Sequence, residues 1–149
     1  MIIRKYQEQD FAGLCSIHDA ARMQELGAAD LVDAFLPLKI AAEREDLFSY
    51  QILVAEKAGK VRGFIAFTED EIAWLYVDPD YQKQGIASEL LRQALKEMPA
   101  DKIYLEVLKG NENAKRLYEH FGFKTIQEES GKMPGNEAFA VTVWLMQRN

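Results

Sequence analysis

The stretch LYVDPDYQKQGIASELLRQAL, from Leu75 to Leu95, joins an apolar strand to an amphipathic helix through a polar turn. The strand ends at Val77, the turn passes through Asp78-Pro79-Asp80, and a lone glycine, Gly85, stands just before the helix. Free backbone N–H groups and the positive end of the helix dipole make such a helix start favourable for a phosphate. The stretch therefore predicts either an anion-binding turn or a simple strand-to-helix connection.

The residues around Gly85 suit close approach of a ligand. Gly85 has no Cβ, Ala87 keeps the next turn position small, and Lys83 adds a positive charge. One glycine forms neither a G-x-G-x-x-G fingerprint nor a Walker loop, so a dinucleotide or ATP is poorly supported.

The composition indicates one globular domain over residues 1–149, with 48% hydrophobic and 28% charged residues. A net charge of −6 argues against a nucleic-acid partner and mildly favours cationic small molecules. The start MIIRKYQEQD lacks the apolar run of a signal peptide, and no apolar stretch is long enough to span a membrane. We therefore expect no membrane partner and a cytoplasmic location. The single Cys15 excludes an intrachain disulfide, and the two distant histidines show no metal-ligand spacing.

Hydrophobic periodicity predicts a mixed α+β fold. A first helix starts at Asp10 and is broken by Gly27, and a second starts at Asp30 and runs through Ala42 with a kink at Pro37. Later helices are expected at Ile86–Met98 and Asn111–Phe121. The expected strands are Ile2–Tyr6, Gln51–Glu56, Val61–Thr68, Glu71–Val77, Lys102–Leu108, Phe123–Glu128 and Phe139–Met146. Short links make the three central strands antiparallel, and a strand–helix–strand unit adds a parallel pair. The prediction is a mixed, mostly antiparallel sheet with helices on both faces.

Two spaced motifs resemble those of the GNAT superfamily, the Gcn5-related N-acetyltransferases. Gln82, Gly85 and Ala87 match the family pattern R/Q-x-x-G-x-G/A of motif A. The later stretch NENAKRLYEHFGFK resembles N-x-x-A-x-x-x-Y-x-x-x-G-F, with matches at Asn111, Ala114, Tyr118, Gly122 and Phe123.

This resemblance implies an N-acetyltransferase that uses acetyl-CoA as co-substrate. In the family, the backbone amides of motif A hold the pyrophosphate, and the pantetheine arm pairs with the preceding strand, here at Leu75 and Val77. That pairing requires the next strand to splay away and leave an open edge. The implied cofactor-binding residues are Leu75, Val77, Gln82, Lys83, Gln84, Gly85, Ile86, Ala87, Ser88, Asn111 and Asn113.

The same resemblance suggests catalytic roles. Tyr118 matches the tyrosine that protonates the CoA sulfur, although a tyrosine on an apolar helical stripe also suits a core position. Leu75 maps to the backbone N–H that stabilises the oxyanion. Two carboxylates are candidates for the general base. Glu71 stands at the start of its strand, where it could also be a solvated turn acid. Glu106 lies on the strand face opposite Ile103, Leu105 and Val107.

The acceptor is expected to be an amine, either a small molecule or a peptide or protein amine. The resemblance places its pocket between the first two helices and the late hairpin. The acids that could attract a cation there, or simply lie in solvent, are Glu25, Asp30, Asp33, Glu128, Glu129 and Glu137. Trp74 and Tyr76 either line the cleft or pack in the core. No cysteine lies in either motif, so direct transfer in a ternary complex is expected. A catalytically silent CoA-binding module, a purely structural domain and a homodimer through the late strands remain alternatives or additions.

Overall fold

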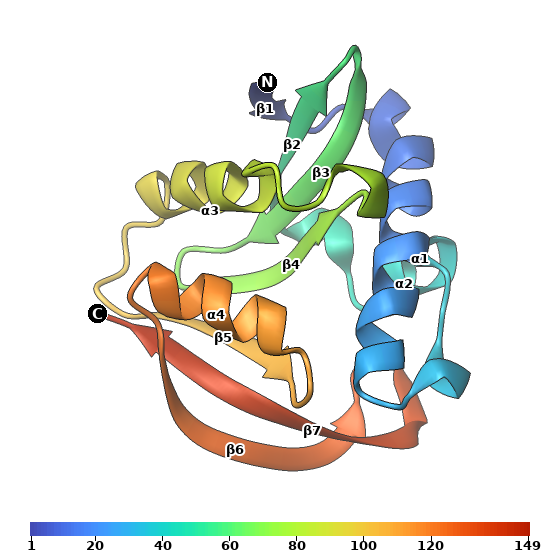
Figure 1. Cartoon of the computed structure of the whole chain (residues 1–149), viewed down its shortest axis with the longest axis vertical. Coiled ribbons are helices and arrows are strands. Elements are labelled where there is room, and N and C mark those ends of the chain that lie inside the picture. The colour runs from blue at the N-terminus through green and yellow to red at the C-terminus, as the bar shows by residue number, and fades with distance from the viewer.

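A computed structural model describes all residues, 1–149, as seven strands and four α-helices (Figure 1). The sheet has the order β1-β2-β3-β4-β5-β7-β6, and only the β4–β5 pair is parallel. The strands are β1 (Ile2–Lys5), β2 (Gln51–Lys57), β3 (Lys60–Phe67), β4 (Glu71–Val77), β5 (Ile103–Leu108), β6 (Lys124–Met133) and β7 (Asn136–Arg148). The helices are α1 (Phe11–Ala28), α2 (Leu38–Arg44), α3 (Ile86–Lys96) and α4 (Glu112–His120). The predicted mixed, mostly antiparallel sheet is confirmed.

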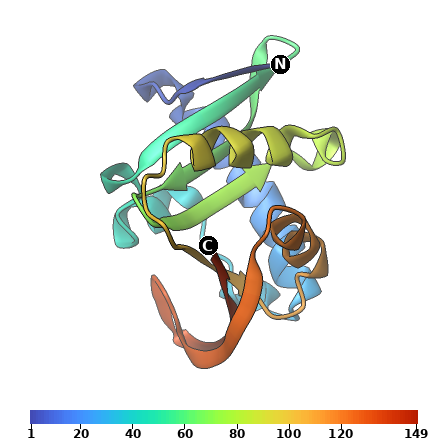
Figure 2. The ribbon, with the colours of Figure 1, turned by 90° about the vertical axis from the view of Figure 1, so that its left-hand side faces the viewer.

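The two faces of the sheet carry separate cores, so the predicted helices on both faces are confirmed. Helices α3 and α4 cover one face, where Leu90 and Leu91 pack with Ile65 and Leu105. Helices α1 and α2 cover the other face. Figure 2 shows the β6–β7 hairpin at the end of the sheet farthest from β1. None of the helices is both long and apolar enough to cross a membrane.

The first two helices differ from the sequence prediction. Helix α1 runs through Gly27 and ends at Ala28, because Gly27 keeps a helical backbone and the left-handed turn falls on Asp30 (φ 58°). The single helix expected from Asp30 is instead a short 3₁₀ turn, Val32–Ala34, followed by α2. Pro37 does not kink a helix but immediately precedes α2, since a proline lacks the N–H that a helix interior requires.

The late hairpin also differs from its prediction. Much of the segment expected as a connection is strand, because β6 continues to Met133 and β7 begins at Asn136. The link is the dipeptide Pro134-Gly135, with Gly135 at φ 75°. The half of β6 beyond Glu128 was missed because its polar side chains nearly all face solvent and show no apolar alternation.

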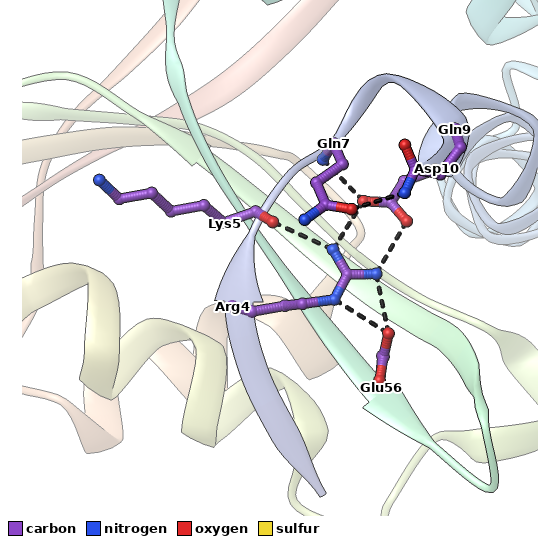
Figure 3. A network of polar contacts seen from close by, with 6 residues as sticks. All are labelled: Arg4, Lys5, Gln7, Gln9, Asp10 and Glu56. Atoms are coloured by element: carbon purple, nitrogen blue, oxygen red, sulfur yellow. Dashed lines mark hydrogen bonds and ion pairs between the residues drawn. The ribbon is translucent and has the colours of Figure 1, made fainter.

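A partly buried ion-pair network fixes the first strand to the start of α1 (Figure 3). The Arg4 guanidinium donates to both Asp10 oxygens at 2.8 Å, and Arg4 Nε donates to Glu56 Oε1 at 2.9 Å. Asp10 Oδ2 also accepts the Gln7 N–H at 2.7 Å. Because Asp10 is only 7% exposed, its charge depends on these donors.

We predict that Asp10→Ala lowers the free energy of unfolding by about 2 kcal/mol at neutral pH. The Arg4 hydrogen bond holds the pKa of Asp10 below its usual value, despite burial. This stabilisation is therefore complete above the unfolded pKa of about 4 and is lost as pH falls through the lower folded pKa. Urea unfolding of both proteins along a pH series measures it. The exposed neighbour Glu8→Ala is the control, and an equal loss in both variants would contradict the assignment.

Candidate active site

Strands β4 and β5 separate soon after they meet, and the sheet opens there. Their parallel pairing includes only Glu71 with Tyr104 and Ile72 with Leu105. The other edge of β5 pairs with β7 along its full length, and a cleft of about 830 Å³ lies beside the free part of β4. The splayed strand pair expected from the sequence is therefore present.

The free edge of β4 presents backbone N–H groups to this cleft. Asp78 N–H donates to Arg62 O at 2.7 Å, which places it on the β3 side of the strand. Successive N–H groups of a strand point in opposite directions, so those of Val77 and Leu75 point away from β3. Both residues line the cleft. An extended ligand chain can therefore pair with β4 as an added strand.

The start of α3 lies at one end of the cleft. The first intrahelical hydrogen bond runs from Glu89 N–H to Gly85 O, so the N–H groups of Ile86, Ala87 and Ser88 have no partner within the helix. Gly85 adopts a left-handed backbone (φ 86°), and no protein atom lies within 4 Å of where its Cβ would be. Lys83 is also left-handed (φ 61°) and curls the loop. The free N–H groups and open space fit a pyrophosphate.

The two glutamines of this loop lie differently. Gln82 Nε2 donates to Val77 O at 3.2 Å and to Gln24 Oε1 at 3.0 Å, so this side chain closes the loop against β4 and α1. Gln84 does not line the cleft, and its Oε1 accepts from Lys57 Nζ at 2.6 Å. Any contact of Gln84 with the cofactor would be through its backbone.

The second motif brings Asn111 and Tyr118 to the cleft on α4. Asn111 caps the helix, with its Oδ1 accepting the Ala114 N–H at 3.3 Å. Tyr118 is only 8% exposed and packs edge-on against Phe123, yet its hydroxyl makes no hydrogen bond to the protein and its side chain lines the cleft. No buried side-chain oxygen or nitrogen of the protein lacks a partner, so this hydroxyl reaches the cleft and is available to a ligand. Burial and then the nearby Glu25 charge raise the pKa of Tyr118, which keeps it a phenol. Asn113, in the first turn of α4, also lines the cleft.

The two base candidates are placed unequally. Glu106 lines the cleft, with its strand neighbours Leu105 and Val107 in the opposite core, as predicted. The pKa of Glu106 is raised by partial desolvation and then by the charges of Glu129 and Glu71. Both carboxylates are exposed, but Glu71 does not line the cleft.

The other end of the cleft is formed by α1, the end of α2 and the late hairpin. Of the six acids considered for an acceptor, only Glu25 lines the cleft. Trp74 and Tyr76 line it too and also pack with the core of the α1–α2 face. Met133, Pro134 and Asn136 from the hairpin complete this end.

Two charged residues of this end were missed by sequence reasoning. Glu45, just after α2, lines the cleft, and desolvation and then Glu137 raise its pKa to about 7 against the opposing effect of Arg22. Arg22 lines the cleft and pairs with Glu25. Neither belongs to a motif, and the packing of α1 against α2 brings them together.

Comparison with known protein families agrees with the fold and the two motifs. The family model described as Acetyltransferase (GNAT) family matches residues 14–123. The chain therefore belongs to the GNAT family of acetyltransferases.

Individual relatives support this assignment. The chain is 29% identical over 130 residues to the uncharacterized N-acetyltransferase YafP of Escherichia coli (strain K12), covering 85% of this chain and 83% of YafP. A GCN5-related N-acetyltransferase structure from Rhodopseudomonas palustris has a TM-score of 0.80 at 21% identity, covering 99% of this chain and 94% of that one. The structure of yncA from Salmonella typhimurium, solved with its cofactor acetyl-CoA, has a TM-score of 0.71 at 19% identity, covering 99% and 92%.

Proposed function

We propose that this acetyltransferase moves an acetyl group from acetyl-CoA to a primary amine by direct transfer in a ternary complex. The observation that carries the proposal is the cleft itself. It joins a free strand edge at Leu75 and Val77, an open helix start at Gly85 and the unpartnered Tyr118 hydroxyl. Family membership and the acetyl-CoA seen with yncA support acetyl-CoA as the co-substrate.

In this mechanism the protein's own groups bind acetyl-CoA, polarise its carbonyl and transfer protons. The N–H groups of Ile86, Ala87 and Ser88 bind the pyrophosphate, with Lys83 adding charge. The N–H of Leu75 stabilises the carbonyl oxygen as the amine attacks and the C–N bond forms. The C–S bond then breaks, and the Tyr118 hydroxyl donates its proton to the departing thiolate.

The amine must lose a proton, and Glu106 is the base we favour over Glu71. Both were equal candidates in the sequence, but Glu106 lines the cleft and Glu71 does not. The proton accepted by Glu106, directly or through water, returns to Tyr118 through solvent, which balances the cycle. A raised pKa brings Glu106 closer to the range where a carboxylate is an effective base.

We predict that Glu106→Gln lowers kcat/KM about 100-fold, while Glu71→Gln retains most activity. In the wild-type enzyme, kcat/KM falls as pH drops through the raised pKa of Glu106, because the protonated carboxyl cannot accept a proton. The pH–rate profile of each variant checks this. If the acidic inflection survives in Glu106→Gln but disappears in Glu45→Gln, Glu45 is the base instead.

The proposed function is tested by thiol release from acetyl-CoA with a panel of amines, amino acids and short peptides. We expect release with one class of amine, which also identifies the acceptor. Acetyl-CoA that raises the melting temperature without release on any acceptor would favour the silent CoA-binding module. No release and no thermal shift would refute the acetyl-CoA site.

The proposal also covers the binding partners and the location of the protein. We propose acetyl-CoA and an amine as the ligands, with no nucleic-acid or membrane partner, in the cytoplasm. A homodimer through the late strands stays a prediction, which sedimentation of the purified protein tests.

A further inference from the structure

Glu25, near the end of α1, binds groups from both sides of the splayed strands. Its Oε1 accepts the Tyr76 hydroxyl of β4 at 3.0 Å, and its Oε2 accepts Asn111 Nδ2 at 3.1 Å, just before α4. Arg22, one turn earlier on α1, forms an ion pair with the same carboxylate. The Glu25 side chain is one-fifth exposed and lines the cleft (20%).

This carboxylate connects elements that the sheet does not. Backbone pairing between β4 and β5 ends at Ile72 and Leu105, so Tyr76 and the start of α4 have no ladder between them. Glu25 forms a side-chain bridge across that gap. Helix α1 passes beside the end of β4 (Figure 1). Its residue Gln24 also accepts a hydrogen bond from Gln82 of the motif A loop.

The Asn111 side chain is held at both ends of its amide. Asn111 Oδ1 caps the Ala114 N–H, and its Nδ2 is bound by Glu25, so both ends of the amide are fixed. Asn111 begins the helix that carries Tyr118. Displacement of this helix start therefore moves the Tyr118 hydroxyl relative to Leu75 on β4.

We propose that Glu25 is a positioning residue, which holds the start of α4 against β4 so that the Tyr118 hydroxyl is aligned with the thioester. This inference rests on the proposed function and deepens it. Burial and the Glu25 charge raise the pKa of Tyr76, which keeps its hydroxyl a donor to this bridge. Small misplacements of a catalytic group cost large factors in rate, so the bridge has a kinetic consequence.

The test is Glu25→Gln with a compensating partner. An amide at position 25 has a single oxygen, so it cannot accept from both Tyr76 and Asn111 as the two carboxylate oxygens do, and the negative charge that strengthens both hydrogen bonds is lost. We expect kcat to fall roughly tenfold, with KM for acetyl-CoA changed much less. The double variant Glu25→Gln/Asn111→Asp reverses the donor and acceptor and still caps Ala114, so kcat should recover above that of Glu25→Gln. The exposed acid Glu43→Gln on α2 is the control.

A second readout does not depend on turnover. Amide hydrogen exchange at Ala114 and Lys115 should be faster in Glu25→Gln and slower again in the double variant, whether or not an acceptor is known. Unchanged exchange at the start of α4 in Glu25→Gln would overturn the positioning role. So would a kcat loss that the double variant does not reduce. If the wild-type protein released no thiol while the variants showed the predicted changes in amide exchange, that result would instead contradict the proposed function and leave the bridge intact.

Discussion

Replacing Tyr118 with phenylalanine is expected to lower kcat for acetyl transfer about 100-fold or more, with KM for acetyl-CoA nearly unchanged. The hydroxyl is the proposed proton donor to the CoA thiolate, and it forms no hydrogen bond to the protein. Phenylalanine keeps the ring that packs against Phe123. Since no protein hydrogen bond is lost, the melting temperature should stay close to that of the wild-type protein.

Because the variant should keep its stability, a loss of kcat would report on the acid role of Tyr118 alone. Steady-state kinetics with saturating acceptor give kcat, and thermal unfolding gives stability. Tyr104→Phe on β5 is the matched control, because Tyr104 does not line the cleft and its variant should keep full activity. A Tyr118→Phe enzyme with wild-type kcat would remove the tyrosine from the mechanism.

Replacing Gly85 with alanine is expected to weaken acetyl-CoA binding roughly 10- to 100-fold. The new Cβ would enter open space at the start of α3, where the pyrophosphate is proposed to bind. No protein atom occupies that space within 4 Å, so the loss is not one of internal packing. The left-handed backbone (φ 86°) adds a strain of about 1 kcal/mol for any residue with a Cβ.

Gly59→Ala separates strain from binding. Gly59, in the β2–β3 turn, is also left-handed (φ 78°), also exposed and also has no atom within 4 Å of a Cβ, but it does not line the cleft. Both variants should lose similar stability, and only Gly85→Ala should lose affinity in calorimetric titration with acetyl-CoA. Equal affinities would mean that Gly85 is needed for the turn alone.

The sheet was largely predictable because its signals are local. Alternating apolar residues and short links placed the three central strands, and the motif at Gly85 placed the start of α3 at Ile86. The α1–α2 region was not, because Gly27 and Pro37 have uses other than ending or kinking a helix. The late hairpin was predicted, but the continuation of β6 beyond Glu128 was missed because its polar residues are mostly exposed.

The site divides in the same way. Motif spacing identified Gly85, Asn111 and Tyr118, which all line the cleft, because each has a fixed place within or just before its own helix. Residues that meet only through tertiary packing left no local pattern. Glu45 and Arg22 are of this kind. The sequence also carried no local sign that Glu106 lines the cleft and Glu71 does not.

The structure of the protein crystallised with acetyl-CoA is the measurement that tests the central claim most directly. We expect the pyrophosphate on the N–H groups of Ile86, Ala87 and Ser88, the pantetheine arm paired with Leu75 and Val77, and the sulfur next to the Tyr118 hydroxyl. Acetyl-CoA bound elsewhere, or a cleft left empty at saturating acetyl-CoA, would contradict the account.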